Sequence, residues 1–196
     1  MDIKSVIESS DMVFVGVGEA FNDSDGSLDA YNKLAGLLNG KNYFVISLCT
    51  DDQIFSSDLN PERIVSPLGG FRKKQCPDGC NDEIFEDGAL TCPYCNKQLV
   101  FNNIYAPKYV EKDYLPQWNK HKLWLSGTLN HSLLLLELGV GMKYPQIVRW
   151  PFERLCMLNN QANLVRVNDI LWQIPAEISD KSTSIKKNPI EYLDLL

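Results

Sequence analysis

The chain has 196 residues, 44% of them hydrophobic and 22% charged, which fits an ordinary globular protein with one well-cored domain. Its formal net charge is −6, and an acidic surface argues against nucleic acid as the main partner because phosphate binding needs a basic face. The longest apolar run, residues 133–142, contains Glu137 and is too short to span a bilayer. We therefore expect neither a nucleic-acid nor a membrane partner.

The N-terminal part alternates short apolar runs with a helical pattern. Residues 12–16 predict a buried strand that runs into a Gly-x-Gly turn, and residues 27–39 carry apolar side chains at helical spacing. Residues 43–48 predict a second strand. The segment 50–70 is rich in loop residues and contains a short helix near Phe55.

The C-terminal part continues the alternation. It predicts, in order, a helix that Pro116 opens, a strand over residues 133–139, a helix over 145–158, a strand over 163–168, a mobile polar surface loop over 179–187, and a C-terminal helix capped by Asn188. Strands that alternate with helices predict an α/β fold with a parallel, Rossmann-like sheet.

Four cysteines between these parts predict a metal site. Cys76 and Cys80 form one closely spaced pair, and Cys92 and Cys95 form another after a gap of eleven residues. Two such pairs can place four thiolates around one tetrahedral zinc ion, and a closed four-cysteine site is structural because it leaves no position for water. The alternatives are two disulfides or free core thiols.

The position of these cysteines predicts the domain organisation. Residues 71–105 form a zinc-ribbon insertion, and residues 1–70 and 106–196 together form the Rossmann-like domain. The N-terminus lacks a charged head, a long apolar stretch and a cleavage site, so we expect no signal peptide. Zinc-type cysteine spacing without an export signal indicates a reducing, cytoplasmic compartment.

Three segments, taken together, resemble one protein family. They are the Gly-x-Gly turn after the first strand, the four-cysteine ribbon, and the phrase LLELGVGMKYPQIVRWPF at 135–152. With YFVISL at 43–48 and PERI at 61–64, this pattern is similar to the sirtuins, NAD-dependent protein deacylases, and in particular to their macrodomain-linked bacterial branch.

The resemblance implies a Rossmann-type sheet with NAD bound at the carboxyl ends of its strands, where the strand order reverses. The residues of this chain that match the family's cofactor positions are Gly16, Gly18, Asp51, Gly139, Gly141 and Asn168. Glycines and an asparagine also serve simply as turn and strand-end residues, so this alternative stays open. The adenosine half of a site for NAD or ADP-ribose is the part the match favours.

The positions that the family uses for catalysis do not match. Leu68 stands where the family has its histidine base, and Cys49 stands where it has an asparagine. In the first loop Ala20 replaces a serine, and Glu19 brings a carboxylate that repels a diphosphate. Only residues 21–42 separate the Gly-x-Gly turn from the next strand, so most of the cofactor-covering loop is absent.

These departures predict a sirtuin-like protein without deacylase activity, acting as a zinc-stabilised module that binds an adenine nucleotide or a protein partner. The alternatives are an active NAD-dependent deacylase or ADP-ribosyltransferase, and a structural partner subunit without a nucleotide site. The two histidines, His121 and His131, are expected in surface or capping roles. Cys49 is expected to be a small buried residue, the alternative being a reactive thiol.

Overall fold

The computed structural model describes residues 3–86 and 88–196. A large sheet is built from β1 (Met12–Val17), β2 (Asn42–Ser47), β3 (Ile64–Val65), β7 (Leu133–Leu138), β8 (Ala162–Val167) and β9 (Ser182–Ile185). A small sheet is built from β4 (Gly69–Gln75), β5 (Phe85–Glu86) and β6 (Val100–Asn103).

The helices are α1 (Ile3–Ser9), α2 (Ser27–Leu37), α3 (Leu115–Ser126), α4 (Arg149–Leu158) and α5 (Pro189–Asp194). Short 3₁₀ turns join them, namely η1 (Glu19–Phe21), η2 (Gln53–Ser56), η3 (Pro61–Arg63), η4 (Glu111–Asp113) and η5 (Ala176–Lys181).

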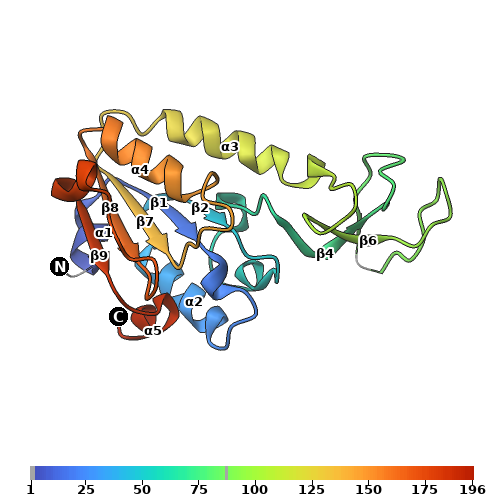
Figure 1. Ribbon diagram of the computed structural model, residues 1–196, viewed down its shortest axis with the longest axis horizontal. Helices are drawn as coiled ribbons and strands as arrows, with labels where there is room; N and C mark the ends of the chain where they lie inside the picture. Colours follow the sequence, from blue (N-terminus) through green and yellow to red (C-terminus); the bar gives the residue numbers. More distant parts are fainter. Residues whose placement is uncertain (1–2, 87) are drawn as a thin grey trace.

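The large sheet has the strand order β3-β2-β1-β7-β8-β9, and every pairing is parallel. The order reverses between β1 and β7, as in doubly wound folds. The small sheet is antiparallel in the order β5-β4-β6, and it extends away from the layered body of the molecule (Figure 1). The predicted α/β fold with its parallel sheet is therefore confirmed.

Helices cover both faces of the large sheet (Figure 1), α3 and α4 on one side and α1, α2 and α5 on the other. The strands β1, β7 and β8 are buried almost throughout, which is why they read as continuous apolar runs rather than alternating ones. No helix among the described residues is long and apolar enough to cross a membrane.

Two elements differ from the prediction. The helix α4 begins at Arg149 and not at residue 145. Pro151 explains this, because proline lacks an N–H and is tolerated only within the first turn of a helix. The polar segment 179–187 is not simply a surface loop, because its central residues form β9, which pairs in parallel with β8. An edge strand is half solvated, so its polar side chains do not prevent the pairing.

The short helix expected near Phe55 is present as η2. The C-terminal helix α5 is capped as predicted, because the Asn188 side chain accepts hydrogen bonds from the backbone N–H groups of Ile190 and Glu191. Its cap explains why so short a helix can end the chain in an ordered form.

The expected role of His121 is wrong, whereas His131 is exposed as expected. The His121 ring is 5% exposed and stacks on Phe14, with ring centroids 5.2 Å apart. Neither of its nitrogens has a hydrogen-bond partner in residues 3–86 and 88–196. Burial among aromatic rings disfavours the charged imidazolium and lowers the pKa of His121 to about 4.

We predict that His121 makes the fold acid-sensitive. The unfolded chain takes up this proton near pH 6.5 and the folded protein only near pH 4, so stability is complete above pH 6.5 and falls as the pH drops through this window. The loss in the free energy of unfolding is about 1–3 kcal/mol. Urea unfolding between these pH values measures it.

The variant His121→Phe fits the aromatic stack and should lose most of this pH dependence. The variant His131→Phe, at the exposed histidine, is the matched control and should keep it. An unchanged acid sensitivity in His121→Phe would contradict the assignment to His121.

Candidate functional site

The carboxyl ends of β1 and β7 meet where the strand order reverses, the usual ligand site of such sheets. The backbone of Gly18 donates a hydrogen bond to the carbonyl of Leu138, over 2.8 Å. Gly139 follows with φ = 64°, a conformation that favours glycine. The structure thus brings four of the predicted cofactor residues to one place, in the order Gly16, Gly18, Gly139 and Gly141.

Close packing accounts for the first two glycines. A Cβ atom on Gly18 would lie 2.2 Å from both the carbonyl oxygen of Gly139 and the Cα of Val140, and a Cβ on Gly16 would lie 2.2 Å from a methyl group of Val148. Both positions therefore exclude a larger residue for reasons of protein packing alone. Their role in binding a cofactor stays a prediction.

Glu19 spans the space between the loops that follow β1 and β7. Its carboxylate oxygen Oε2 accepts a hydrogen bond from the backbone N–H of Gly141, over 2.8 Å. The other oxygen, Oε1, is buried and has no hydrogen-bond partner in the described part of the chain. Backbone N–H groups at such turns are the donors that bind phosphate oxygens. A carboxylate of the protein occupies this donor instead.

Asp51 lies beside this region, and its carboxylate is occupied by hydrogen bonds from the protein backbone. Its carboxylate accepts hydrogen bonds from the backbone N–H groups of Asp23 and Gln53, at 2.7 and 3.1 Å. The side-chain oxygen of Asn22 in turn accepts hydrogen bonds from the backbone N–H groups of Thr50 and Asp51, at 2.8 and 3.2 Å. These bonds fix the short segment after β1 against the end of β2.

Asn168 holds the loops after β7 and β8 together. Its amide nitrogen donates to the carbonyl of Val140 over 3.0 Å, and its oxygen accepts from the N–H groups of Ile170 and Leu171 at 3.0 and 2.8 Å. The side chain is 5% exposed. The strand-end role left open by the sequence is thus present, whereas a contact with a nucleotide ribose stays a prediction.

A buried network of charges beneath these loops was not foreseen. Arg166 donates to Glu137 from Nε and Nη2, at 2.7 and 2.9 Å, and also to Glu153 at 2.8 Å. Arg149 lies 3.4 Å from Glu137, and it donates hydrogen bonds to the carbonyls of Val140 and Leu171, at 3.3 and 3.0 Å. The four charges balance, which is what makes their burial tolerable.

The sequence does contain a signal for this network. Glu137 interrupts the apolar run of β7, and Arg166 interrupts that of β8. The two are direct neighbours in the sheet register. Charged residues are almost never fully buried unless they are paired. An acid and a base on adjacent predicted buried strands therefore indicated an ion pair.

Leu68 and Cys49, the two residues that differ from the catalytic positions of the resembled family, are both buried. Leu68 is 4% exposed and belongs to the hydrophobic core between the sheet and the helices α3 and α4. Cys49 is 2% exposed, and its thiol lies 3.3 Å from the carbonyl of Gly18 and 3.6 Å from the hydroxyl of Tyr31. Burial raises the pKa of Cys49 to about 12, which disfavours the thiolate form that a nucleophile needs.

The four cysteines of the ribbon come together as a cluster. The sulfur atoms of Cys76, Cys80, Cys92 and Cys95 all lie within 4.8 Å of one another. The pairs Cys76–Cys95, Cys76–Cys80 and Cys80–Cys92 are 3.6, 3.3 and 3.4 Å apart. Four thiolates bound to zinc at about 2.3 Å would lie about 3.8 Å apart, so the cluster fits such an ion after a small expansion. These four cysteines could hold a metal ion.

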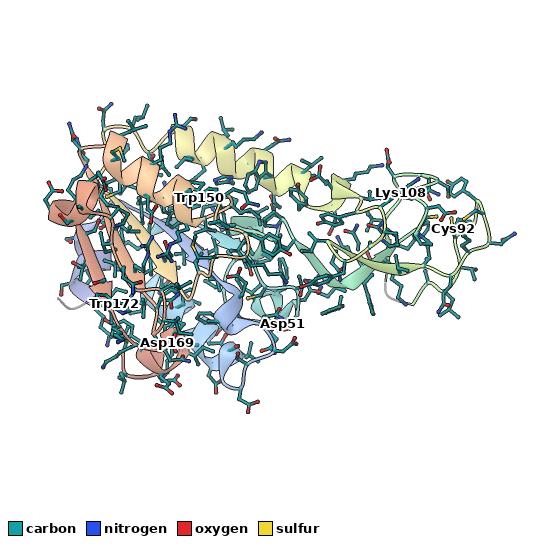
Figure 2. All side chains as sticks on the ribbon, viewed as in Figure 1. Asp51, Cys92, Lys108, Trp150, Asp169 and Trp172 are labelled. Atoms are coloured by element: carbon teal, nitrogen blue, oxygen red, sulfur yellow. The ribbon has the colours of Figure 1, made fainter. Side chains whose placement is uncertain are left out.

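Backbone geometry supports the cluster. Burial alone would raise the pKa of Cys76. Hydrogen bonds from the backbone N–H groups of Cys80 and Asp78 outweigh this effect, and the pKa falls to about 6. Similar backbone bonds from Tyr94 and Cys95 lower the pKa of Cys92 against the effect of burial. Cys92 lies towards the outer end of the ribbon, away from Asp51 at the sheet edge (Figure 2), so a metal there is remote from the loops after β1 and β7.

Comparison with known proteins finds two informative relatives. A protein ADP-ribosyltransferase of Staphylococcus aureus is 21% identical over 180 residues, which cover 81% of this chain and 57% of the relative. A probable bifunctional ADP-ribose hydrolase/ADP-ribosyltransferase of Fusarium oxysporum is 24% identical over 154 residues, which cover 65% of this chain and 26% of the relative.

The chain therefore spans little more than half of the first relative and about a quarter of the second. No family model matches the chain. Its similarity is thus to part of proteins named for ADP-ribosyl transfer.

Proposed function

We propose that this chain is a sirtuin-like protein that has lost deacylase chemistry and acts as a nucleotide-binding or protein-interaction module. Residues 1–70 and 106–196 would form its Rossmann-like domain and residues 71–105 its zinc-ribbon insertion, in a protein of the cytoplasm. The observation that carries the proposal is Leu68, an apolar and buried side chain at the position where the resembled family has its catalytic base. A leucine cannot accept a proton.

The nucleotide would bind at the loops after β1 and β7. Both relatives are named for ADP-ribosyl chemistry, which favours NAD or ADP-ribose as the ligand. The backbone of Gly18, Gly139 and Gly141 would face the diphosphate, with Gly16 beneath and Asn168 and Asp51 at the ribose ends. Glu19 opposes this binding, because it holds the N–H of Gly141 and adds negative charge.

An active ADP-ribosyltransferase is the second candidate function. The name of the Staphylococcus aureus relative favours it, since the match covers 81% of this chain. Such an enzyme would need groups that position the reactive ribose and exclude water. The buried Leu68, the buried Cys49 and the short segment between β1 and β2 speak against those groups being complete.

The first prediction of this proposal concerns nucleotide binding. ADP-ribose and NAD should both bind weakly, with similar dissociation constants of about 0.1–1 mM. This corresponds to a binding free energy of roughly −5.5 to −4 kcal/mol. Removing the carboxylate in Glu19→Ser should tighten both several-fold, because the N–H of Gly141 becomes available. Isothermal titration calorimetry measures this.

The matched control is Glu8→Ser, which makes the same charge change at an exposed position of α1, a helix that precedes β1. It should leave the affinity unchanged. If neither nucleotide binds at millimolar concentration to the native chain or to Glu19→Ser, the nucleotide part of the proposal fails and the protein-interaction reading remains.

The second prediction concerns catalysis. The purified chain should release no nicotinamide from NAD in the presence of acyl-lysine peptides. Leu68→His should not restore activity, because Cys49 and the short segment between β1 and β2 also differ from the family pattern, and residues that act as a unit are strongly non-additive. Leu68→Met is the conservative control. Nicotinamide release by the native chain would contradict the proposal and support the transferase alternative.

The third prediction concerns the metal. One zinc ion per chain should co-purify, as measured by mass spectrometry, and a chelator should lower the thermal stability of the ribbon, because structural zinc contributes folding free energy directly. Cys92→Ser should lose the ion. Cys156→Ser, at a buried thiol outside the cluster, is the control and should keep it. A metal-free preparation with an unchanged melting curve would overturn this assignment.

A further inference from the structure

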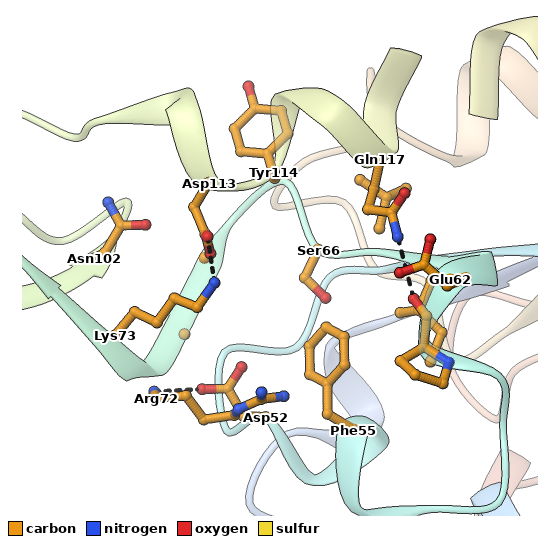
Figure 3. Close-up of a pocket in the computed structure, with 15 residues that line it drawn as sticks. Asp52, Phe55, Glu62, Ser66, Arg72, Lys73, Asn102, Asp113, Tyr114 and Gln117 are labelled. Carbon is orange, nitrogen blue, oxygen red and sulfur yellow. Dashed lines mark hydrogen bonds and ion pairs between the residues drawn. The ribbon is translucent and has the colours of Figure 1, made fainter. Parts of the chain in front are cut away.

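A second cavity, apart from the loops after β1 and β7, lies where the edge strand β3 meets the ribbon. Its volume is about 410 Å³, within the range of small-molecule sites. The end of β3 and the turn η2 form one side, β4 and β6 another, and the start of α3 the third (Figure 3). β3 is the outermost strand on this side of the sheet.

Three residues that line this cavity each carry a buried oxygen atom without a hydrogen-bond partner among the described residues. These atoms are Asn102 Oδ1, Gln117 Oε1 and Ser66 Oγ. Asn102 is 1% exposed. A buried polar group without a partner costs about 1–3 kcal/mol. Three such atoms around one cavity indicate a site built for a hydrogen-bonding ligand.

The orientation of both amides is fixed, so their free atoms are acceptors. The nitrogen of Asn102 donates to Oε1 of Gln75 and to the carbonyl of Val110, at 2.6 and 2.8 Å. Gln75 Oε1 also accepts from the N–H of Val110, which establishes it as an oxygen. The nitrogen of Gln117 donates to the carbonyl of Pro61 over 3.4 Å. A flip of either amide would break these bonds.

Asp52 adds a charged acceptor to the same wall. Its Oδ2 accepts hydrogen bonds from the backbone N–H groups of Phe71 and Arg72, at 2.5 and 2.8 Å. Its other oxygen is directed into the space between Ser66 and Phe55 (Figure 3). Gly70 must be glycine for this arrangement, since a Cβ there would lie 2.2 Å from the carboxylate.

The cations of the cavity are already engaged. Lys73 pairs with Asp113 at 2.5 Å, and the guanidinium of Arg72 lies 4.8 Å from the centre of the Phe55 ring. Of the three carboxylates in the lining, Asp113 is paired with Lys73 and Glu62 with Lys120, which leaves Asp52 as the charged acceptor. A ligand must therefore bring the donors. A guanidinium group presents several N–H donors in a planar fork, whereas an ammonium group is compact. Because the acceptors come from three different elements, the spread N–H donors of a guanidinium group suit them better than a compact ammonium group does.

We infer that this cavity binds a guanidinium group, either of a free small molecule or of an arginine side chain in a peptide. The site uses none of the residues proposed to bind the nucleotide, although Asp52 directly follows Asp51 in the chain. Asn102, Gln117 and Ser66 would accept its hydrogen bonds, and Asp52 would balance its charge.

Isothermal titration calorimetry of the full chain with N-acetyl-arginine amide tests this inference. The ligand should bind, and N-acetyl-citrulline amide, which has the same shape without the charge, should bind at least tenfold more weakly. A peptide with one arginine between glycines is the second arm. Tighter binding of the peptide assigns the site to protein segments, and equal binding assigns it to a free ligand.

Three variants locate the binding. Asp52→Asn keeps an oxygen for the backbone N–H groups but removes the charge, and it should weaken binding at least tenfold. Ser66→Ala and Gln117→Met each remove one acceptor and should weaken it about three- to tenfold. Asp25→Asn, an exposed residue outside the cavity, makes the same charge change and should have no effect. Thermal melting checks that each variant folds.

Two results would overturn the inference. One is the absence of arginine-amide binding up to about 10 mM, which would mean that solvent alone satisfies the oxygen atoms. The other is binding that Ser66→Ala, Gln117→Met and Asp52→Asn all leave unchanged, which would place the ligand elsewhere on the molecule.

Discussion

The loops after β1 and β7 meet backbone to backbone, and this contact decides what the carboxyl edge of the sheet can hold. Gly18 lies so close to Gly139 and Val140 that any side chain there would collide with main-chain atoms. The same edge is where doubly wound sheets bind their ligands. Here the two loops are joined further by the carboxylate of Glu19 on the N–H of Gly141. A nucleotide that used the N–H of Gly141 would have to displace that carboxylate, which is why we expect weak binding.

The buried charges beneath these loops give the edge its rigidity. Arg149 and Asn168 both donate to the carbonyl of Val140, and Arg166 places its guanidinium against Glu137 in the middle of the sheet. Removing one partner from such a network leaves an unpaired buried charge and costs about 3–5 kcal/mol. The carboxyl edge is therefore held by bonds within the protein itself.

The sequence predicted the parallel sheet and the four-cysteine cluster because both depend on patterns that are local. Apolar runs mark β1, β2, β7 and β8, and the cysteine spacing specifies the cluster. It did not predict β9, whose polar residues pair only because β8 offers a free edge. Nor did it predict that His121 is buried, since this depends on α3 packing against Phe14. The cavity beside β3 is lined by segments that are far apart in the chain, so no local sequence pattern predicts it.

We propose that the loops after β1 and β7 form a weak site for an adenine nucleotide, although Leu68 stands where the resembled family has its catalytic base. Amide chemical shifts of the uniformly ¹⁵N-labelled chain, recorded during addition of ADP-ribose, test it most directly. The account predicts progressive shifts confined to residues 16–20, 138–142 and 168–171, with none around the cysteine cluster. The absence of shifts at millimolar ligand, or shifts confined to other parts of the molecule, would contradict it.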